Sequence, residues 1–167
     1  MRIGLLICFF WMQALHCSTE FFLTNFKNDW ARCYEKLIAQ TGVNVFVESG
    51  TYLGDTSQKA AGYFQEIHTV ELNEIFYEQS TSYLKTYSNV TVYHGNTIDH
   101  FPKILLDLEK RGKKALFWLD GHYMTSMQEE HVADRPEAEY TPIMKELSFI
   151  CQQCADPVIL RAYPKIN

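Results

Sequence analysis

The chain has 167 residues and a mass of 19.5 kDa, which is enough for one domain with a buried core and too little for two. Hydrophobic residues make up 47% of the chain and charged residues 21%, which excludes a disordered or collagen-like protein. The net charge of −5 argues against a protein that coats nucleic acid, so no nucleic-acid partner is expected.

Residues 1–18 have the layout of a secretory signal peptide, which predicts export or membrane association. One basic residue, Arg2, precedes a mostly apolar run over residues 3–15. This run is shorter than the ~20 apolar residues that cross a bilayer comfortably. The alternative is an uncleaved anchor that keeps the protein close to a membrane through residues 3–15.

After this leader the chain alternates between helical and strand-like patterns. Gly42 is expected to end the first helix, because glycine commonly follows a helix C-terminus. Thr141 and Pro142 are typical of a helix start. The expected elements are a helix before Gly42, helices at 56–66, 74–86, about 101–108 and after Thr141, and strands at 43–47, 67–70, 90–93, 115–119 and 157–160.

This alternation predicts an α/β protein with a Rossmann-like, doubly wound and mostly parallel sheet of about five strands. Helices are expected on both faces, because the strands are nearly continuous apolar runs. Residues 115–119 are apolar throughout and are therefore expected in the centre of the sheet.

Polar residues stand where four consecutive strands are expected to end. In doubly wound sheets, ligands bind outside the carboxyl ends of the strands. The sequence therefore predicts a ligand site at this edge. The strand-end residues are Glu48, Glu71, Gly95 with Asn96, and Asp120.

The most specific of these ends is the connection that follows Glu48. Gly50 permits a tight turn, and Gly54 is expected to let the backbone approach a ligand where the next helix begins. The connection lacks the three-glycine dinucleotide fingerprint, which argues against a nucleotide-dependent oxidoreductase. It also lacks the Gly-Lys-Ser/Thr of a P-loop, which argues against nucleotide triphosphate hydrolysis.

Two blocks carry a resemblance to a known superfamily. The sequence Val45-Phe46-Val47-Glu48-Ser49-Gly50-Thr51-Tyr52-Leu53-Gly54-Asp55-Thr56, with Glu71 after the next strand, resembles the cofactor site of class I S-adenosylmethionine-dependent methyltransferases. The block Phe117-Trp118-Leu119-Asp120-Gly121-His122-Tyr123 and the helix Thr141-Pro142-Ile143-Met144-Lys145-Glu146-Leu147 resemble one group within that superfamily. The resemblance covers residues from about 25 to 160 and implies a single methyltransferase-like domain over 25–167.

The resemblance implies a role for each strand end. Glu71 would accept hydrogen bonds from both ribose hydroxyls of S-adenosyl-L-methionine, which suits the paired oxygens of a carboxylate. Asp120, His122 and Tyr123 would face the substrate. The residues implied in cofactor binding are Glu48, Gly50, Thr51, Gly54, Asp55, Glu71, Gly95 and Asn96.

The reaction implied is methyl transfer to a hydroxyl of a small molecule or sugar. A histidine with a pKa near 6.5 suits a general base at neutral pH, which is the role implied for His122. Asp120 could orient that base or bind a divalent cation. The alternatives without a role in function are a solvated charge for Glu71, a turn residue for Asn96 and a loop histidine for His122.

The end of the chain departs from the group's pattern. Relatives carry an acidic pair after the fifth strand, whereas Arg161 follows it here, which weakens the metal prediction. The sheet is expected to be truncated after this strand. The alternative function is therefore a truncated, catalytically inactive cofactor-binding or interaction domain.

Two further expectations follow. A strand at 157–160 with nothing beyond it would be an unpaired edge, which predicts a homodimer with its interface at residues 143–163. The cofactor is made in the cytosol, so the need for it predicts a domain that faces the cytosol, in conflict with export of a cleaved protein.

Overall fold

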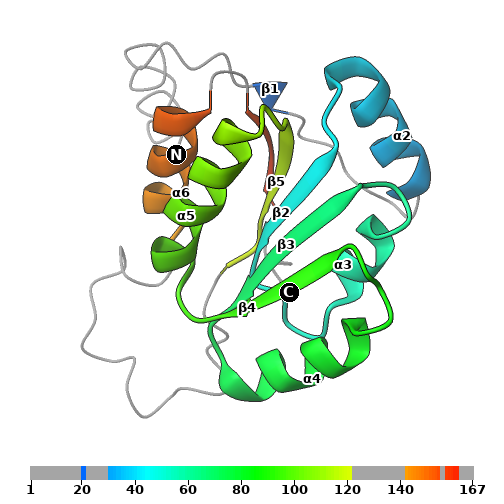
Figure 1. The fold of residues 1–167 in the computed structure, drawn as a ribbon, viewed down its shortest axis with the longest axis vertical. Coiled ribbons are helices and arrows are strands. Elements are labelled where there is room, and N and C mark those ends of the chain that lie inside the picture. Colours follow the sequence, from blue (N-terminus) through cyan, green and yellow to red (C-terminus); the bar gives the residue numbers. More distant parts are fainter. Residues whose placement is uncertain (1–19, 22–29, 122–141, 155–156, 162–167) are drawn as a thin grey trace, which may run out of the picture.

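The computed structural model describes residues 20–21, 30–121, 142–154 and 157–161. They form one parallel sheet of six strands in the order β1-β6-β5-β2-β3-β4, with helices packed beside it (Figure 1). The doubly wound α/β class expected from the sequence is therefore confirmed. The elements are β1 (Glu20–Phe21), α2 (Trp30–Thr41), β2 (Val45–Ser49), α3 (Asp55–Ala60), β3 (Glu66–Glu71), α4 (Glu74–Leu84), β4 (Val90–His94), α5 (Thr97–Lys110), β5 (Ala115–Leu119), α6 (Ile143–Gln153) and β6 (Val158–Arg161).

The centre of the sheet is formed by β2 and β5. Every residue of both strands is buried, because helices cover both faces there. The central position expected for residues 115–119 is confirmed. The chain winds outward from β2 through β3 to β4, then crosses back to β5 and β6, so the switch in winding direction lies between β2 and β5.

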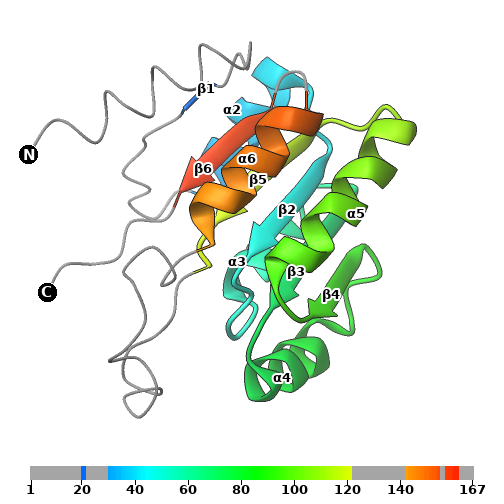
Figure 2. The same ribbon diagram turned by 90° about the vertical axis from the view of Figure 1, so that its left-hand side faces the viewer.

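Two apolar layers hold the helices on the sheet. α5 and α6 pack on one face, and α2 and α3 pack on the other (Figures 1 and 2). Successive residues of β5 alternate between these layers, because strand side chains point to opposite faces in turn. Phe117, for example, lies in the layer under α5, and Trp118 lies in the layer under α2.

The helix expected over 56–66 is shorter in the structure. It ends at Ala60, and a turn at 61–63 leads directly into β3, which begins at Glu66. Gly62 in this turn supplies no side chain to continue a helix face. The first helix ends at Thr41 as expected, with Gly42 at a φ of 72°.

The outer edge of β6 is not bare, which corrects the expectation of an unpaired edge at 157–160. β1 pairs with it in parallel, with Glu20 opposite Val158 and Phe21 opposite Ile159. A strand of two residues has no detectable period in the sequence, so this pairing could not be anticipated. The homodimer remains a prediction, but the unpaired strand edge on which that prediction was based is absent, because β1 pairs with β6.

The leader at 1–18 lies outside the described residues, so its role as a signal peptide or anchor also remains a prediction. Across the described parts of the chain, none of the helices combines the length and apolar character needed to cross a membrane.

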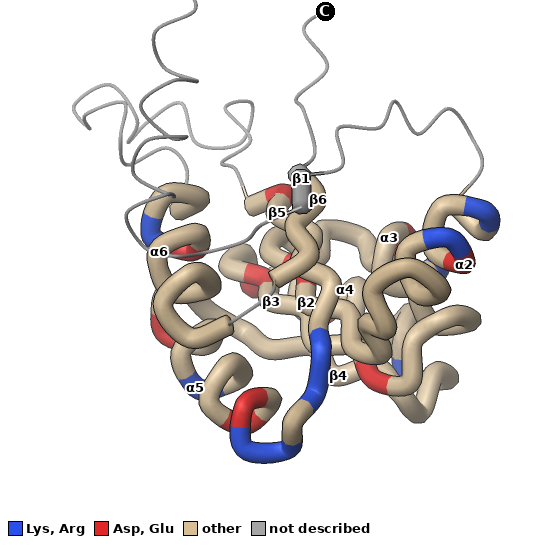
Figure 3. The backbone as a smooth tube through the Cα atoms, turned by 90° about the horizontal axis from the view of Figure 1, so that it is seen from above, with Lys and Arg blue, Asp and Glu red and all other residues tan. Residues whose placement is uncertain are grey.

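Ion pairs tie α5 to the starting end of the sheet. Arg111, just after α5, donates two hydrogen bonds of 2.8 Å to the two carboxylate oxygens of Glu66, the first residue of β3. Its guanidinium also contacts Asp107 of α5. In the view from above, the basic stretch after α5 is drawn in blue beside acidic residues in red (Figure 3). This ion-pair cluster lies at the end of the sheet where the strands begin, opposite the edge at which they end.

Candidate functional site

The sheet brings the four predicted strand ends to one edge. Ser49 at the end of β2 lies opposite Val70 of β3 and Leu119 of β5, and Glu71 lies opposite His94 of β4. The paired strands are parallel, and the arrowheads of β2 and β6 point downward in Figure 2. The segments after β2, β3, β4 and β5 therefore emerge side by side, which is the arrangement that the sequence predicted.

Glu71 is held at this edge by two backbone amides. Its Oε2 accepts a hydrogen bond of 2.7 Å from the N–H of Tyr52, and its Oε1 accepts one of 2.9 Å from the N–H of Asn73. Only 7% of the residue is exposed. A carboxylate offers about four lone-pair positions, so each oxygen of Glu71 retains capacity for a further donor. Because Glu71 is buried and bound by two amides, it is not a surface charge surrounded by water.

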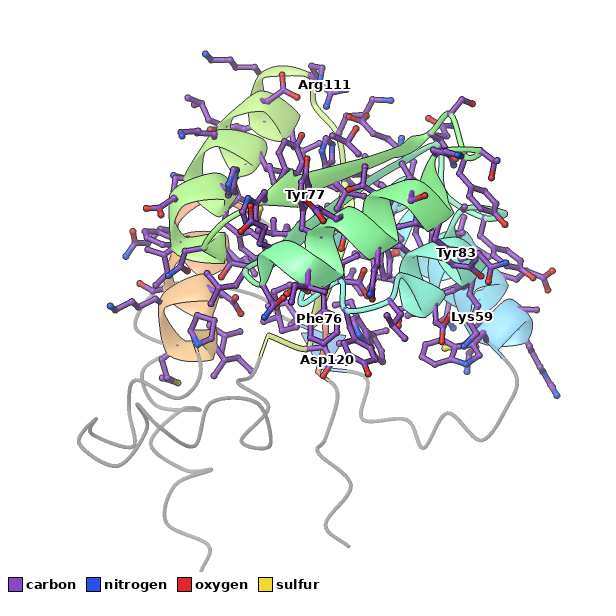
Figure 4. The ribbon with its side chains drawn as sticks, turned by 90° about the horizontal axis from the view of Figure 1, so that it is seen from below. Lys59, Phe76, Tyr77, Tyr83, Arg111 and Asp120 are labelled. Carbon is purple, nitrogen blue, oxygen red and sulfur yellow. The ribbon has the colours of Figure 1, made fainter. Side chains whose placement is uncertain are left out.

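Tyr52 links Glu71 to the turn after β2. It is the one non-glycine residue among those described with a positive φ, at 51°. This conformation is costly for a bulky residue and turns its N–H toward Glu71. Its ring packs edge-on against Phe76 of α4, with 4.7 Å between the ring centroids. Figure 4 shows Phe76 near the same margin of the molecule as Asp120.

Exposed apolar side chains occur in the two segments whose backbone amides bind Glu71. Tyr52, Leu53 and Leu72 are all well exposed, and Ile75 in the first turn of α4 is 63% exposed. Sequence reasoning did not single out this margin, because periodicity places an apolar residue on a helix or strand without showing what covers it.

Glu48 lies beneath the turn rather than at its surface. Its Oε2 accepts hydrogen bonds of 2.6 Å from Ser57 and 2.7 Å from Thr69, and Thr51 completes the cluster with a 2.6 Å bond to Thr69. The pKa of Glu48 is raised to about 8, because burial and, to a smaller extent, the charge of Asp120 outweigh the lowering effect of the hydrogen bonds from Ser57 and Thr69. Glu48 and Thr51 are thus parts of a buried polar cluster.

The two glycines of this turn, Gly50 and Gly54, would bring a Cβ against different neighbours. A Cβ on Gly50 would lie 2.7 Å from the backbone oxygen of Asp120, so the absence of a side chain lets β2 and β5 continue side by side. A Cβ on Gly54 would meet the side chains of Leu84 and Tyr83 instead. The side of Gly54 that would carry a Cβ therefore faces α4, and its approach to a ligand stays a prediction.

Asp55 and Asn96 both occupy helix starts. Asp55 is the exposed first residue of α3, where a negative charge interacts favourably with the helix dipole. Asn96 caps α5, with its Oδ1 accepting a 3.1 Å hydrogen bond from the N–H of Ile98. Gly95 precedes it at a φ of 132°, with His100 beside the position of a Cβ. Asn96 thus caps a helix, its side-chain NH₂ takes no part in this bond, and its contact with the cofactor stays a prediction.

Asp120 is half-buried and leaves β5 alongside the turn after β2. Its N–H donates to the backbone oxygen of Ser49, and the N–H of Gly121 donates to the Ser49 hydroxyl, both at 3.1 Å. His122 and Tyr123 lie outside the described residues, so their roles remain predictions. The described residues contain no group of three or more His, Cys, Asp or Glu that could hold a metal ion.

Glu146 is the site residue that sequence reasoning did not identify. It is fully buried in α6, and its carboxylate accepts hydrogen bonds from Thr97 and Ser49. The signal was available, because Glu146 follows Ile143 by three residues and precedes Ile150 by four. That spacing places a charged residue on the apolar face of a helix.

A scan against family models and a search of curated proteins found no match for this chain. Solved structures do show partial similarity to it. A candidate caffeoyl-CoA O-methyltransferase from Staphylococcus aureus is 21% identical over 52% of this chain and 42% of that one, with a TM-score of 0.41. The O-methyltransferase TomG from Streptomyces achromogenes, involved in tomaymycin synthesis and solved with S-adenosylmethionine, is 21% identical over 55% and 43%, with a TM-score of 0.42.

A candidate type II methyltransferase from Anaeromyxobacter dehalogenans is 15% identical over 75% of this chain and 43% of that one, with a TM-score of 0.41. This chain therefore spans less than half the length of each of the three structures. All three are described as methyltransferases or candidates for that activity. Similarities of this extent transfer no residue role to this chain.

Proposed function

We propose that this chain binds S-adenosyl-L-methionine and transfers its methyl group to a hydroxyl of a small molecule or sugar. The observation that carries the proposal is the fixed carboxylate of Glu71 at the end of β3, beside the glycine turn that follows β2. The resemblance of this turn and of the block around Asp120 to class I methyltransferases supports it.

The residues at this edge fit the proposed cofactor. Glu71 has lone pairs left for two hydroxyls, and the surrounding backbone amides hold it in place. The exposed apolar side chains of Leu72 and Ile75 offer a surface for the flat, weakly polar adenine ring. Glu48 is buried beneath the turn and accepts a hydrogen bond from Ser57, and we assign it the role of supporting the turn.

The chemistry divides between the cofactor and the chain. When bound, the cofactor supplies an electrophilic methyl group. The chain's residues orient the acceptor hydroxyl and exclude water from it, and orientation is a large part of such catalysis. We assign the general base to His122 and its orientation to Asp120. A divalent cation at Asp120 is a less supported variant of the same proposal.

The first prediction tests the cofactor site by calorimetric titration with S-adenosylhomocysteine, S-adenosylmethionine and NAD. Wild-type protein is expected to bind the first two and not NAD. Glu71→Ala should weaken the binding of S-adenosylhomocysteine by roughly ten- to a hundred-fold, because a charged acceptor for two hydroxyls is lost. Glu78→Ala, an exposed glutamate of α4, is the control and should bind like wild type. Unchanged affinity in Glu71→Ala contradicts the assignment.

The second prediction separates chemistry from binding. His122→Ala should keep nearly full affinity for S-adenosylhomocysteine while losing methyl transfer, measured with labelled cofactor and a panel of hydroxyl-bearing small molecules and sugars. A parallel loss of binding would assign His122 to structure. Cofactor binding without transfer in the wild-type protein would support an inactive cofactor-binding domain instead.

A further inference from the structure

Glu146 lies at a junction between three strand ends. Its Oε1 accepts a 2.6 Å hydrogen bond from the hydroxyl of Thr97, and its Oε2 accepts a 3.3 Å hydrogen bond from that of Ser49. Ser49 in turn accepts the N–H of Gly121 at 3.1 Å. The side chain of Glu146 thus connects α6 to the end of β2, the start of α5 and the segment that leaves β5.

The direction of each bond in this chain is determined by chemistry. The N–H of Gly121 can only donate, so the Ser49 oxygen accepts from it and the single Ser49 hydrogen is left for Glu146. The hydroxyl of Thr97 donates to the other oxygen of Glu146. When Glu146 is ionised, each of its oxygens accepts from one hydroxyl, whereas a carboxamide at position 146 would replace one of these acceptors by an NH₂ donor.

A side chain at position 121 would be crowded by this chain of hydrogen bonds. A Cβ there would lie 3.1 Å from the Ser49 hydroxyl oxygen and 3.5 Å from Glu146 Oε1. Close packing and hydrogen bonding therefore fix the backbone just after Asp120. An apolar residue at position 146 could fill the same volume at lower desolvation cost, so stability alone does not account for a buried carboxylate.

Each residue tied to Glu146 adjoins one that belongs to the proposed site. Ser49 precedes Gly50, Thr97 follows Asn96, and Gly121 follows Asp120. We propose that Glu146 is the positioning residue of this site: through Ser49 it fixes the Asp120–Gly121 backbone against the cofactor turn. The significance for ligand binding rests on the proposed function, whereas the positioning of Gly121 does not.

The experiment compares Glu146→Gln and Ser49→Ala with Ile150→Val, a buried residue one turn further along α6 that makes none of these bonds. Amide hydrogen exchange at Gly121 is the direct readout. Exchange at Asp120 is the internal reference, because its N–H bonds to the backbone oxygen of Ser49 and survives both substitutions.

Gly121 exchange should accelerate by about tenfold or more in Glu146→Gln and Ser49→Ala, with much less change at Asp120. Ser49→Ala removes the acceptor of the Gly121 N–H, and Glu146→Gln removes the charged group that holds Ser49 in place. Ile150→Val should lower the melting temperature without this selective change. Glu146→Asp, which keeps the carboxylate but shortens its reach to Ser49, provides the result if Glu146→Gln does not fold. Equal protection of Gly121 in wild type and in a folded Glu146 variant would overturn the proposal, because Ser49→Ala removes the acceptor of the Gly121 N–H whatever Glu146 does.

Titration with S-adenosylhomocysteine then separates the two ideas. A wild-type protein that binds it should lose several-fold affinity in Glu146→Gln and none in Ile150→Val, since only the former loosens the turn. Unchanged affinity in a Glu146→Gln protein with fast Gly121 exchange would overturn the positioning role for the ligand. A wild-type protein with no affinity, yet with the selective exchange change, would refute the proposed function and leave the positioning of Gly121 supported.

Discussion

Gly50 shows how a residue that looks like a ligand contact can first be a requirement of packing. Its φ is 81°, and a Cβ would lie 2.7 Å from the backbone oxygen of Asp120. A backbone atom in a sheet has little freedom to move away. Gly42, at a φ of 72°, has the same conformational demand but no atom within 4 Å of a Cβ.

The third prediction uses this pair of glycines. Gly42→Ala should cost about 1 kcal/mol of unfolding free energy, the strain of a left-handed alanine. Gly50→Ala should cost more than about 3 kcal/mol, since a backbone clash is added to that strain. Urea denaturation monitored by circular dichroism measures both. Equal costs for the two substitutions would mean that the Asp120 backbone moves aside freely.

The starts of α4 and α5 are built alike, from an asparagine with extended backbone. The Oδ1 of Asn73 accepts the N–H groups of Ile75 and Phe76, and that of Asn96 accepts the N–H of Ile98. Each satisfies helix-end donors that would otherwise be left to water. Of the two, only Asn96 is among the residues that the resemblance implies in cofactor binding.

The fourth prediction separates capping from cofactor binding at Asn96. Asn73→Ala and Asn96→Ala should each lower stability by about 1 kcal/mol, the usual value of an N-cap. Only Asn96→Ala should also weaken the binding of S-adenosylhomocysteine, because the side-chain NH₂ of Asn96 is lost. Asn96→Asp is the control that keeps an acceptor for the cap. If Asn96→Ala binds like wild type, this residue is a cap alone.

At the scale of the whole molecule, three glutamates have shifted pKa values of opposite sign. Burial raises the pKa of Glu48 to about 8 and that of Glu146 to about 7, from an ordinary 4.5. The bidentate bond from Arg111 lowers the pKa of Glu66 to about 2, with His68 contributing. The first two bind protons more tightly in the folded state, and Glu66 binds them more tightly in the unfolded state.

The fifth prediction is the resulting pH profile. As pH falls from about 4.5 to about 2, stability from Glu66 is lost; as pH rises from about 4.5 to about 8, stability is lost because Glu48 and Glu146 must ionise while buried. Glu48→Gln should reduce the loss of melting temperature between pH 5 and pH 8, and Glu66→Gln should reduce the loss on the acid side. Glu35→Gln, an exposed glutamate of α2, should change neither slope. An unchanged alkaline slope in Glu48→Gln contradicts the assignment.

The sequence by itself determined the order of helices and strands, the central place of residues 115–119 and the polar edge that ends at Glu48, Glu71 and Asp120. These features are local, because periodicity, apolar runs and strand-end residues are visible within a short window. Parallel pairing follows from them, since the alternation of strands and helices permits little else. The pairing of β1 with β6 was not visible, because two residues show no period.

Only the tertiary structure decided what each polar residue at that edge does. Glu71 is fixed by two amides from neighbouring segments, Glu48 is buried under hydroxyls, and a Cβ on Gly54 would meet α4. Glu146 reaches the same edge from about 100 residues away, through Ser49. The physical reason is that burial and hydrogen-bond partners belong to the folded chain, where segments distant in sequence exclude water from a residue and supply its donors.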